Sequence, residues 1–543
     1  MPVTQTIPDR LLAPAADWAA LRAGFRWPLP ARMNIAELCC TRWARRAPAR
    51  VAMQIVREDG PARAVSYAAL ERDANRLAHV LAAQGVGRGD RVAVVLPQML
   101  ETVLTHVAAY KLGAIVVPLF TLFGEDGLLF RLADSGAAAL VTDAANLPKI
   151  TALRDRLPDL ATVLCTDGPG PGALAFWPLV ARAADTPVAA DTGPEDPAFL
   201  SYTSGTTGPP KGALHGHRVL LGHLPGVELH HNFLPQPGDR LWTPADWAWM
   251  GGLANVMLPA LFYGVPLVAY RMAKFDPDRA VRLMADLGIR NVFLPPTALK
   301  LMRQAPPPRG LGPRSVASGG EALGAEMLDW GRGVFGVEIN EFYGQTECNL
   351  VLSNCAAVAL PVPGAMGRAV PGHDVAVLGG DGTPLPPGET GEIAVRRPDP
   401  GMFLEYWNRP DKTAEKFRGD WMLTGDTGRV EADGLFRFSA RTDDVITSSG
   451  YRIGPSEIED CLTGHPGVAM AAVVGLPDPV RTEYVCAFVV PRDGGSPALG
   501  KALIAHVRAR LSPHVAPREV RFVADLPMTA TGKIMRRALK EGA

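Results

Sequence analysis

The sequence has no long hydrophobic run. No stretch supplies the roughly 20 uninterrupted apolar residues that a membrane-spanning helix needs. An apolar region from His106 to Leu129 is interrupted by Lys111, Glu125 and Asp126, which favours a buried helix followed by a strand. The first 20 residues contain charged side chains and lack the apolar core of a secretory signal. We therefore expect no membrane span and no secretory leader.

The sequence also has few cysteines and no net charge. Seven cysteines, an odd number without a Cys-x-x-Cys pair, argue against a disulfide framework and against a structural zinc site. We therefore expect a reducing, cytoplasmic compartment. Lys+Arg and Asp+Glu are equal at 55 each, so no global basic field exists that would hold nucleic acid or an anionic membrane. Any anionic ligand must be bound by a local group of residues.

The length and the patterning predict at least two domains of the α/β class. A chain of 543 residues exceeds the size at which a single hydrophobic core stops growing. A helical stripe over 67–83 is followed by a buried strand over 91–96, and helix and strand alternate again up to 138–141. This alternation predicts a layered domain with largely parallel strands. Short alternating strands over 364–438 predict an antiparallel β subdomain, and a separate small unit follows from about Asp443.

The stretch from Tyr202 to Gly212 has the chemistry of a phosphate-binding loop. Its small and hydroxyl-bearing residues leave backbone amides free to close on phosphate groups, and Lys211 adds positive charge. The loop does not follow the Walker pattern, because two prolines stand between its last glycine and the lysine. Such a run alone is more often a flexible linker.

Four more stretches combine polar residues and glycines in apolar surroundings. They are Glu341 to Glu347, Leu423 to Gly428, Arg441 to Arg452 and Leu526 to Lys533. Each alone has a structural interpretation, such as a turn around Asp426 or a weak surface ion pair at Arg441. Together with the loop, and in this order, they resemble the acyl-adenylate-forming (ANL) superfamily of acyl-CoA synthetases, adenylation domains and luciferases. The resemblance spans about Asn34 to Arg537.

Within this superfamily the chain is most similar to the AMP-forming acetyl-CoA and medium-chain acyl-CoA synthetases, through 274–277 and 449–455. The resemblance implies that a carboxylate attacks ATP to give acyl-AMP and pyrophosphate, and that coenzyme A then displaces AMP. It implies a large N-terminal domain of layered α/β subdomains plus a small β subdomain, residues 1–442. A small mobile C-terminal α+β lid, residues 443–543, would follow, with a hinge at Asp443. ATP, Mg²⁺ and coenzyme A would bind, and a homo-oligomer is left open.

The resemblance also implies roles for individual residues. The residues implied at ATP are Thr203, Ser204, Gly205, Thr206, Thr207, Gly208, Lys211, Gly320, Glu321, Ala322, Glu341, Phe342, Tyr343, Gly344, Gln345, Thr346, Asp426, Arg441 and Lys533. The catalytic residues among the implied set are Thr346, Glu347, Arg441 and Lys533. Glu347 would bind Mg²⁺, and Lys533 would stabilise the adenylation transition state. The residues implied at coenzyme A are Ser449, Gly450, Tyr451, Arg452 and Arg481.

The acid pocket is expected to be deeper than acetate requires. In acetyl-selective relatives a tryptophan occupies the position of Gly344, and a valine often occupies that of Gly319. Two glycines remove side-chain volume, so we expect a short-chain, medium-chain or branched acid. Trp249 would border the pocket, with Met250, Gly251 and Leu253 beside it. Asn349 is expected to cap the next helix, although its amide could instead bind a polar group of the acid.

Other interpretations carry less weight. Five histidines, His215, His217, His223, His230 and His231, lie close in sequence, but no carboxylate or cysteine accompanies them at metal-ligand spacing. Cys348 is not needed as a nucleophile. One alternative function is the loading of a carrier-protein thiol, which a fused carrier domain would support, and the sequence contains none. A non-catalytic nucleotide-binding relative is the other, and the retention of Asp426, Glu347 and Lys533 argues against it.

Overall fold

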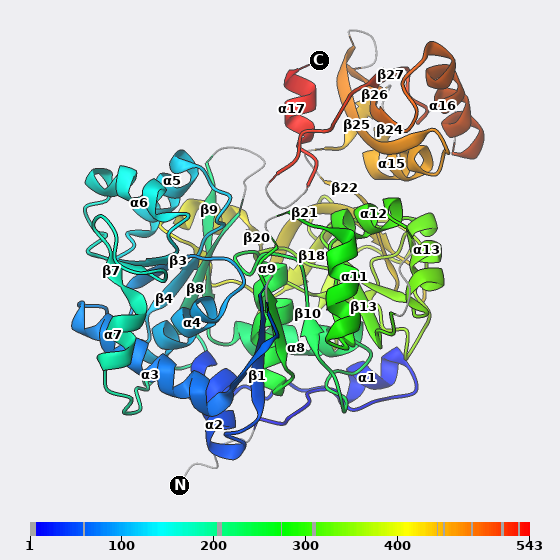
Figure 1. The fold of residues 1–543 in the computed structure, drawn as a ribbon. Helices are drawn as coiled ribbons and strands as arrows, with labels where there is room; N and C mark the ends of the chain where they lie inside the picture. Colours follow the sequence, from blue (N-terminus) through cyan, green and yellow to red (C-terminus); the bar gives the residue numbers. More distant parts are fainter. Residues whose placement is uncertain are drawn as a thin grey trace.

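The computed structural model describes residues 7–57, 60–203, 209–272, 274–306, 311–441, 444–448, 451–478, 482–511, 515–529 and 533–542. A larger body contains two mixed sheets and a small β subdomain, and a smaller body carries the C-terminal sheet (Figure 1). In the described part of the chain, no helix is both long and apolar enough to span a membrane.

One large sheet has the strand order β19-β9-β8-β4-β3-β5-β6-β7. Its strands are β3 (Arg91–Val95), β4 (Ile115–Pro118), β5 (Ala139–Thr142), β6 (Thr162–Cys165), β7 (Leu174–Ala175), β8 (Pro197–Thr203), β9 (Lys211–Gly216) and β19 (Glu405–Tyr406). The accompanying helices are α3 (Tyr67–Ala83), α4 (Leu100–Leu112), α5 (Glu125–Ser135), α6 (Leu147–Leu153) and α7 (Phe176–Arg182). The predicted alternation is confirmed, and the Ser66 side chain caps α3 as its first turn requires.

The other large sheet has the order β16-β15-β14-β13-β12-β10-β11-β1-β2. Its strands are β1 (Val51–Val56), β2 (Arg63–Ser66), β10 (Leu241–Trp242), β11 (Leu267–Tyr270), β12 (Asn291–Phe293), β13 (Ser315–Gly319), β14 (Ile339–Tyr343), β15 (Leu352–Ser353) and β16 (Arg368–Ala369). Helices of this region are α11 (Pro277–Asp286), α12 (Pro296–Gln304) and α13 (Ala325–Phe335). Strands β10 to β14 and β1 pair in parallel, so their carboxyl ends share one edge of the sheet.

One hydrophobic core joins the two sheets. It contains residues of β3, of β11 to β13 and of α8 (Val219–His230), whose twelve residues are all buried. A helix that is apolar on all sides is typically enclosed by protein, as α8 is here. Shorter helical segments complete this body. They are α1 (Trp18–Gly24), η1 (Glu37–Thr41), α2 (Arg42–Arg46), η2 (Arg154–Arg156), α9 (Met250–Gly252), η3 (Leu253–Met257) and α10 (Leu258–Tyr263).

The predicted β subdomain is confirmed as an antiparallel sheet. Its strands are β17 (Val375–Leu378), β18 (Thr390–Arg396), β20 (Phe417–Arg418), β21 (Trp421–Val430) and β22 (Phe436–Arg441), with α14 (Pro410–Glu415) beside them. Strand β21 alternates buried and half-buried positions along its length. This period of two is what a strand with one covered face requires.

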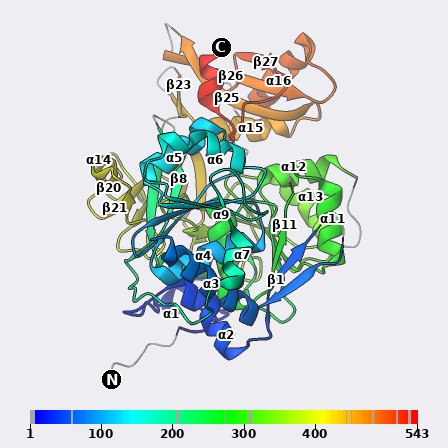
Figure 2. The same ribbon diagram turned by 60° about the vertical axis from the view of Figure 1, so that its left-hand side comes forward.

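The C-terminal body has its own sheet and its own hydrophobic clusters. Its strands are β23 (Ile446–Ser448), β24 (Tyr451–Ile453), β25 (Val468–Asp478), β26 (Thr482–Pro491) and β27 (Glu519–Phe522). Its helices are α15 (Pro455–Thr463), α16 (Pro497–Arg510) and α17 (Arg536–Glu541). Both views show this body outside the larger one, with α15 facing it (Figures 1 and 2). The predicted boundary residue, Asp443, lies outside the described residues.

Candidate functional site

Asp426 lies at the centre of a group of residues from three separate motifs. Strands β21 and β22 place it directly opposite Arg441, whose Nη1 lies 3.2 Å from Asp426 Oδ1. The other oxygen, Oδ2, accepts hydrogen bonds from the Tyr343 hydroxyl at 2.5 Å and from Gln345 Nε2 at 2.6 Å. The Asp426 side chain is only 5% exposed. Three of the residues predicted at ATP therefore meet at the carboxylate of a fourth.

Tyr343 is held as a hydrogen-bond donor at this point. Burial, and then the neighbouring charge of Asp426, raise the pKa of Tyr343 well above its ordinary value. The phenol therefore stays protonated and can only donate to the carboxylate. A second donor, Gln345 Nε2, also bonds the Thr424 carbonyl at 2.7 Å, which fixes the amide orientation.

Glu341 is a buried carboxyl group in the middle of β14. Its Oε1 accepts a hydrogen bond of 2.9 Å from the backbone amide of Leu323. Burial raises the pKa of Glu341 to about 7, although the Leu323 hydrogen bond opposes this shift. Leu323 follows β13, and Glu341 belongs to the neighbouring strand β14. The bond therefore ties the segment after β13 to β14, in addition to the strand pairing of Ser318 with Glu341.

The predicted adenine segment lies between this carboxyl group and Trp249. Gly320 has φ +104°, a value that L side chains rarely adopt, and a Cβ there would lie 3.4 Å from the Trp249 ring. The next residue, Glu321, is 3.7 Å from the Lys300 ammonium group. Ala322 is exposed and directly precedes Leu323. The segment therefore runs from β13 past the Trp249 ring to the bond with Glu341.

Glu347 and Lys211 lie on either side of one tyrosine that the sequence analysis missed. The Tyr406 hydroxyl donates a short hydrogen bond to Glu347 Oε1, and Lys211 Nζ lies 4.7 Å from the centroid of the Tyr406 ring. No hydrogen bond from a described residue reaches Glu347 Oε2. A carboxylate oxygen of this kind is a ligand that Mg²⁺ prefers, so the donor chemistry fits a magnesium ion shared with nucleotide phosphates. No sequence motif indicated Tyr406, because its place in the site depends on the pairing of β19 with β9, which only the structure shows.

The phosphate-type loop is flanked by two residues that face each other. Thr203 ends β8, Lys211 begins β9, and the two are register partners of a hairpin. Thr346, predicted at the α-phosphate, is half-buried beside Glu347. The remaining loop residues, Ser204, Gly205, Thr206, Thr207 and Gly208, lie outside the described residues.

The two pocket glycines do not leave open space, which corrects the argument for a deep pocket. At Gly319 a Cβ would lie 2.6 Å from the Phe342 ring. At Gly344 it would lie 2.2 Å from the backbone nitrogen of Leu350. Real Cβ atoms essentially never come so close to another heavy atom, so both glycines permit close packing instead of creating a cavity. The volume is filled by the Phe342 ring and by the backbone after Asn349.

Phe342 was predicted at the nucleotide, but its ring belongs to a row of aromatic side chains. The ring centroids of Trp249 and Phe293 are 5.7 Å apart, and those of Phe293 and Phe342 are 5.3 Å apart. His230 stacks on the far side of Phe342 at 4.7 Å. Side chains alternate in a strand, so Phe342 points away from the side of β14 where its neighbour Tyr343 bonds Asp426. The row forms an apolar wall that begins at Trp249.

The other expected pocket residues surround Trp249. Met250 and Leu253 are buried in α9 and in the short π-helical segment η3. A Cβ at Gly251 would lie 2.8 Å from the Trp249 ring, so this glycine lets the ring pack on the helix. The expectation that Asn349 caps a helix is wrong, because no helix follows it before β15 and its Nδ2 donates to Asn255 Oδ1 at 2.6 Å.

The five clustered histidines are core residues. All five are buried, and His215 stacks on Phe199 with a centroid distance of 4.8 Å. Burial lowers the pKa of His217 to about 4 and the pKa of His230 to about 3, so both are neutral. Over the described ranges, no group of three or more histidine, cysteine or acidic residues could hold a metal ion. Burial also raises the pKa of Cys348 well above its ordinary value, which disfavours a thiolate there.

The predicted lid residues are only partly described. Lys533 is exposed, and its backbone amide donates to Thr529 Oγ1 at 3.1 Å. Among the described residues, no hydrogen bond or ion pair joins the Lys533 ammonium group to the Asp426 group. Asp443, Ser449, Gly450 and Arg481 lie outside the described residues, and for Tyr451 and Arg452 only the backbone of β24 is described.

Arg536, which the sequence analysis also missed, ties the lid segment together. Its Nη2 bonds Glu459 Oε2 at 2.7 Å and its Nη1 lies 3.3 Å from Asp444 Oδ2. The arginine thus connects α17, shortly after Lys533, to α15 and to the residue that follows the predicted hinge.

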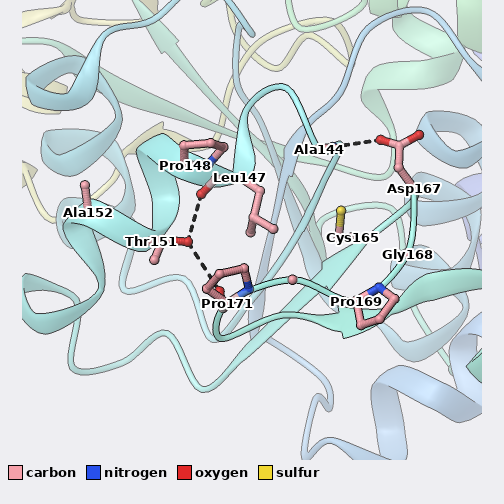
Figure 3. Close-up of a pocket in the computed structure, with 11 residues that line it drawn as sticks. Ala144, Leu147, Pro148, Thr151, Ala152, Cys165, Asp167, Gly168, Pro169 and Pro171 are labelled. Carbon is pink, nitrogen blue, oxygen red and sulfur yellow. Dashed lines mark hydrogen bonds between the residues drawn. The ribbon is translucent and has the colours of Figure 1, made fainter.

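One pocket in the described part of the chain lies away from this group of residues. It has a volume of about 600 Å³ and is bordered by α6 and the connection after β6 (Figure 3). The Thr151 hydroxyl donates to the Leu147 carbonyl at 3.0 Å and to the Pro171 carbonyl at 3.3 Å, and Asp167 accepts from the Ala144 amide. None of the predicted site residues lines it.

Comparison with known proteins identifies the family. Residues 40–407 match the AMP-binding enzyme family, and residues 457–533 match the AMP-binding enzyme C-terminal domain. The human mitochondrial acyl-coenzyme A synthetase ACSM4 is 35% identical, covering 97% of this chain and 93% of the relative. The rat mitochondrial acyl-coenzyme A synthetase ACSM2 is 34% identical, covering 94% of this chain and 92% of the relative.

Solved structures agree with these relatives. The anthranilate CoA ligase AuaEII in complex with anthranoyl-AMP has a TM-score of 0.85 at 28% identity, covering 95% of this chain and 98% of that structure. An acyl-CoA synthetase from Brucella canis has a TM-score of 0.73 at 34% identity, covering 98% of this chain and 96% of that structure. The motifs, the fold and the relatives lead to the same conclusion. The chain belongs to the AMP-binding enzyme family of the acyl-adenylate-forming superfamily, and it is an AMP-forming acyl-CoA synthetase.

Proposed function

We propose that ATP binds between the Asp426 group, Glu341 and Glu347, and that the acid attacks the α-phosphorus there. The observation that carries the proposal is the convergence of Tyr343, Gln345 and Arg441 on the Asp426 carboxylate. A carboxylate held from three directions is pre-oriented to accept hydrogen bonds from the ribose hydroxyls. The segment from Gly320 to Ala322 would border the adenine.

The first half-reaction needs charge neutralisation more than proton transfer. The acid is already an anion, so the difficulty is to bring two anions together and to stabilise the charge on the phosphoryl oxygens. Lys211 and the adjoining loop would hold the β- and γ-phosphates, and Thr346 would bond the α-phosphate. Glu347 would hold Mg²⁺, which neutralises phosphate charge when it is bound.

The second half-reaction calls for a movement of the C-terminal body. We place the domain boundary between residues 442 and 443, with Asp443 as the hinge. The support is that the last sheet and its two hydrophobic clusters contain only residues after that point. An exposed Lys533 without a bond to the Asp426 group fits a lid that brings this lysine in for adenylation only. Ser449, Gly450, Tyr451, Arg452 and Arg481 remain the predicted contacts of coenzyme A.

We infer an acid with an apolar body, bound against Trp249. The Trp249 ring is half-buried and packs towards the buried rings of Phe293 and Phe342, so its surroundings are aromatic and apolar. Short-chain, medium-chain and branched acids fit this surface, and each buried methylene would contribute about 0.8 kcal/mol. The anthranilate CoA ligase among the similar structures adds aromatic acids to the set. A cytoplasmic location stays a prediction from the sequence.

The proposal is tested with a panel of acids. The purified protein is incubated with ATP, Mg²⁺ and acids from acetate to octanoate, branched acids and benzoate, and pyrophosphate, AMP and acyl-CoA are measured with and without coenzyme A. We expect coenzyme A-dependent release of AMP with an acid larger than acetate. Activity on acetate alone would contradict the proposed acid. A variant Asp426→Ala that forms acyl-AMP as well as the wild type would contradict the proposed nucleotide site.

A further inference from the structure

The segment around β19 is joined to both sides of the proposed triphosphate site. The Phe403 amide donates to the Glu347 carbonyl, and the Trp407 amide donates to the Gly212 carbonyl, each at 2.7 Å. Between these two bonds, Tyr406 pairs with Ala213 of β9. The backbone of β19 is therefore fixed against the end of the Glu341–Glu347 motif and against the strand that begins at Lys211.

The Tyr406 side chain contacts the charged groups of both elements. It is 3% exposed, its hydroxyl donates to Glu347 Oε1, and its ring faces the Lys211 ammonium group at 4.7 Å. A phenol carries its proton at neutral pH, so the hydroxyl acts as the donor to this carboxylate. In the described part of the chain, no ion pair joins Lys211 directly to Glu347.

This separation has a chemical consequence. If Lys211 paired directly with Glu347, the ammonium group would compete with a metal ion for the carboxylate, and the carboxylate would compete with phosphate for the lysine. The phenol prevents this competition, because it holds the lysine by a cation–π contact and occupies one carboxylate oxygen with a hydrogen bond. The other oxygen, Oε2, is left without a donor from the described residues.

We propose that Tyr406 is a positioning residue that keeps Glu347 and Lys211 apart and orients both for a divalent cation bound to a nucleoside triphosphate. The inference rests on the proposed role of Glu347 as the metal ligand. Groups that hydrogen-bond a metal-ligating carboxylate typically change metal affinity by about 10- to 100-fold when they are removed. Tyr406 has the position and the chemistry of such a group.

The test is Tyr406→Phe, which keeps the ring and removes the hydroxyl. Binding of Mn²⁺, as a paramagnetic substitute for Mg²⁺, is measured by electron paramagnetic resonance on the full-length protein with a non-hydrolysable ATP analogue. We expect Mn²⁺ to bind about 10- to 100-fold more weakly. Acyl-AMP formation should require a correspondingly higher Mg²⁺ concentration, while thioester formation from supplied acyl-AMP should be unchanged.

Tyr263→Phe is the matched control. The Tyr263 hydroxyl also donates to a buried carboxyl group, at Glu228 Oε1, at 2.6 Å, but this pair lies between α8 and α10 and outside the proposed site. Loss of an equivalent hydrogen bond there should lower the melting temperature and leave Mn²⁺ binding unchanged. A second variant, Tyr406→Leu, also removes the ring and should raise the KM for ATP beyond the effect of Tyr406→Phe.

The variant Glu347→Gln distinguishes an error in the proposed metal-binding role of Glu347 from an error in the inference about Tyr406. If Glu347→Gln leaves Mn²⁺ binding unchanged, the proposed function of Glu347 is wrong and the inference falls with it. If Glu347→Gln weakens Mn²⁺ binding while Tyr406→Phe behaves like Tyr263→Phe, the inference is overturned and the metal-binding role of Glu347 stands.

Discussion

Tyr343 and Asp426 are 83 residues apart in the chain and are joined by a hydrogen bond of 2.5 Å from hydroxyl to carboxylate. The bond links β14, in a large mixed sheet, to β21, in the antiparallel subdomain. It crosses from one sheet to another, because β14 and β21 belong to different sheets in the described part of the chain. The position of the proposed ribose-binding carboxylate therefore depends on the relative placement of these sheets.

The first prediction concerns this bond. Tyr343→Phe should lower kcat/KM for adenylation by about 10- to 100-fold, because a hydrogen bond to a charged group contributes about 1.5–3 kcal/mol. The measurement is ATP-dependent pyrophosphate release under saturating acid. Tyr484→Phe is the control, since its hydroxyl donates to Glu519 at 2.7 Å in the C-terminal body. Equal losses in the two variants would contradict a specific role for Tyr343.

The second prediction separates the two half-reactions. Lys533→Ala should abolish acyl-AMP formation and leave thioester formation from supplied acyl-AMP largely intact. The expected loss is a few kcal/mol of transition-state stabilisation, as for other charged groups at a developing anion. Lys501→Ala, on the exposed surface of α16, is the control. If Lys533→Ala lowers the rates of acyl-AMP formation and of thioester formation equally, the proposal that the lid changes position between the two half-reactions is wrong.

The third prediction concerns pH. The pKa of Glu341 is raised by burial from its ordinary value of 4.5 to about 7, so the folded state binds a proton that the unfolded state releases. The stabilisation is complete below pH 4.5 and is lost as the pH rises through about 7, which corresponds to about 3 kcal/mol. Glu341→Gln stays neutral, so its melting temperature relative to the wild type should rise between about pH 4.5 and about pH 7 and level off at higher pH.

The control for this pH dependence is Glu389→Gln, which removes an exposed carboxyl group. Its melting temperature relative to the wild type should not change with pH. If the difference in melting temperature between Glu341→Gln and the wild type also does not change with pH, Glu341 ionises as an ordinary carboxyl group.

The fourth prediction concerns the acid. Phe342→Ala empties the space that the ring fills beside Gly319, so longer acids should gain about 0.8 kcal/mol for each additional buried methylene. The ratio of kcat/KM for octanoate to that for butyrate measures the change. The substitution should also cost about 3–5 kcal/mol of stability, as the loss of a buried phenylalanine does elsewhere.

Phe335→Ala serves as the control for the lost stability. Phe335 is buried on α13 and packs against Trp330, outside the aromatic row. It should destabilise the protein without changing the ratio. An unchanged ratio in Phe342→Ala as well would show that the acid does not reach this wall.

The sequence alone determined the local elements and the chemistry available at the site. Periodicity and Ser66 placed α3, glycine and hydroxyl residues indicated a phosphate-binding segment from Tyr202 to Gly212, and the ordered motifs supplied Asp426, Glu347 and Lys533. These features depend on residues that are close in the chain, because a helix stripe, a cap and a strand alternation repeat over only a few positions.

Only the tertiary structure decided which distant residues touch. It placed Tyr406 between Glu347 and Lys211, filled the space beside Gly319 with Phe342, and paired Asn349 with Asn255. A glycine in a sequence shows a missing side chain, but whether the space is empty depends on which chain segment packs there. That choice is made by strand register and by close packing between segments that are separated in the chain, and no local pattern encodes it.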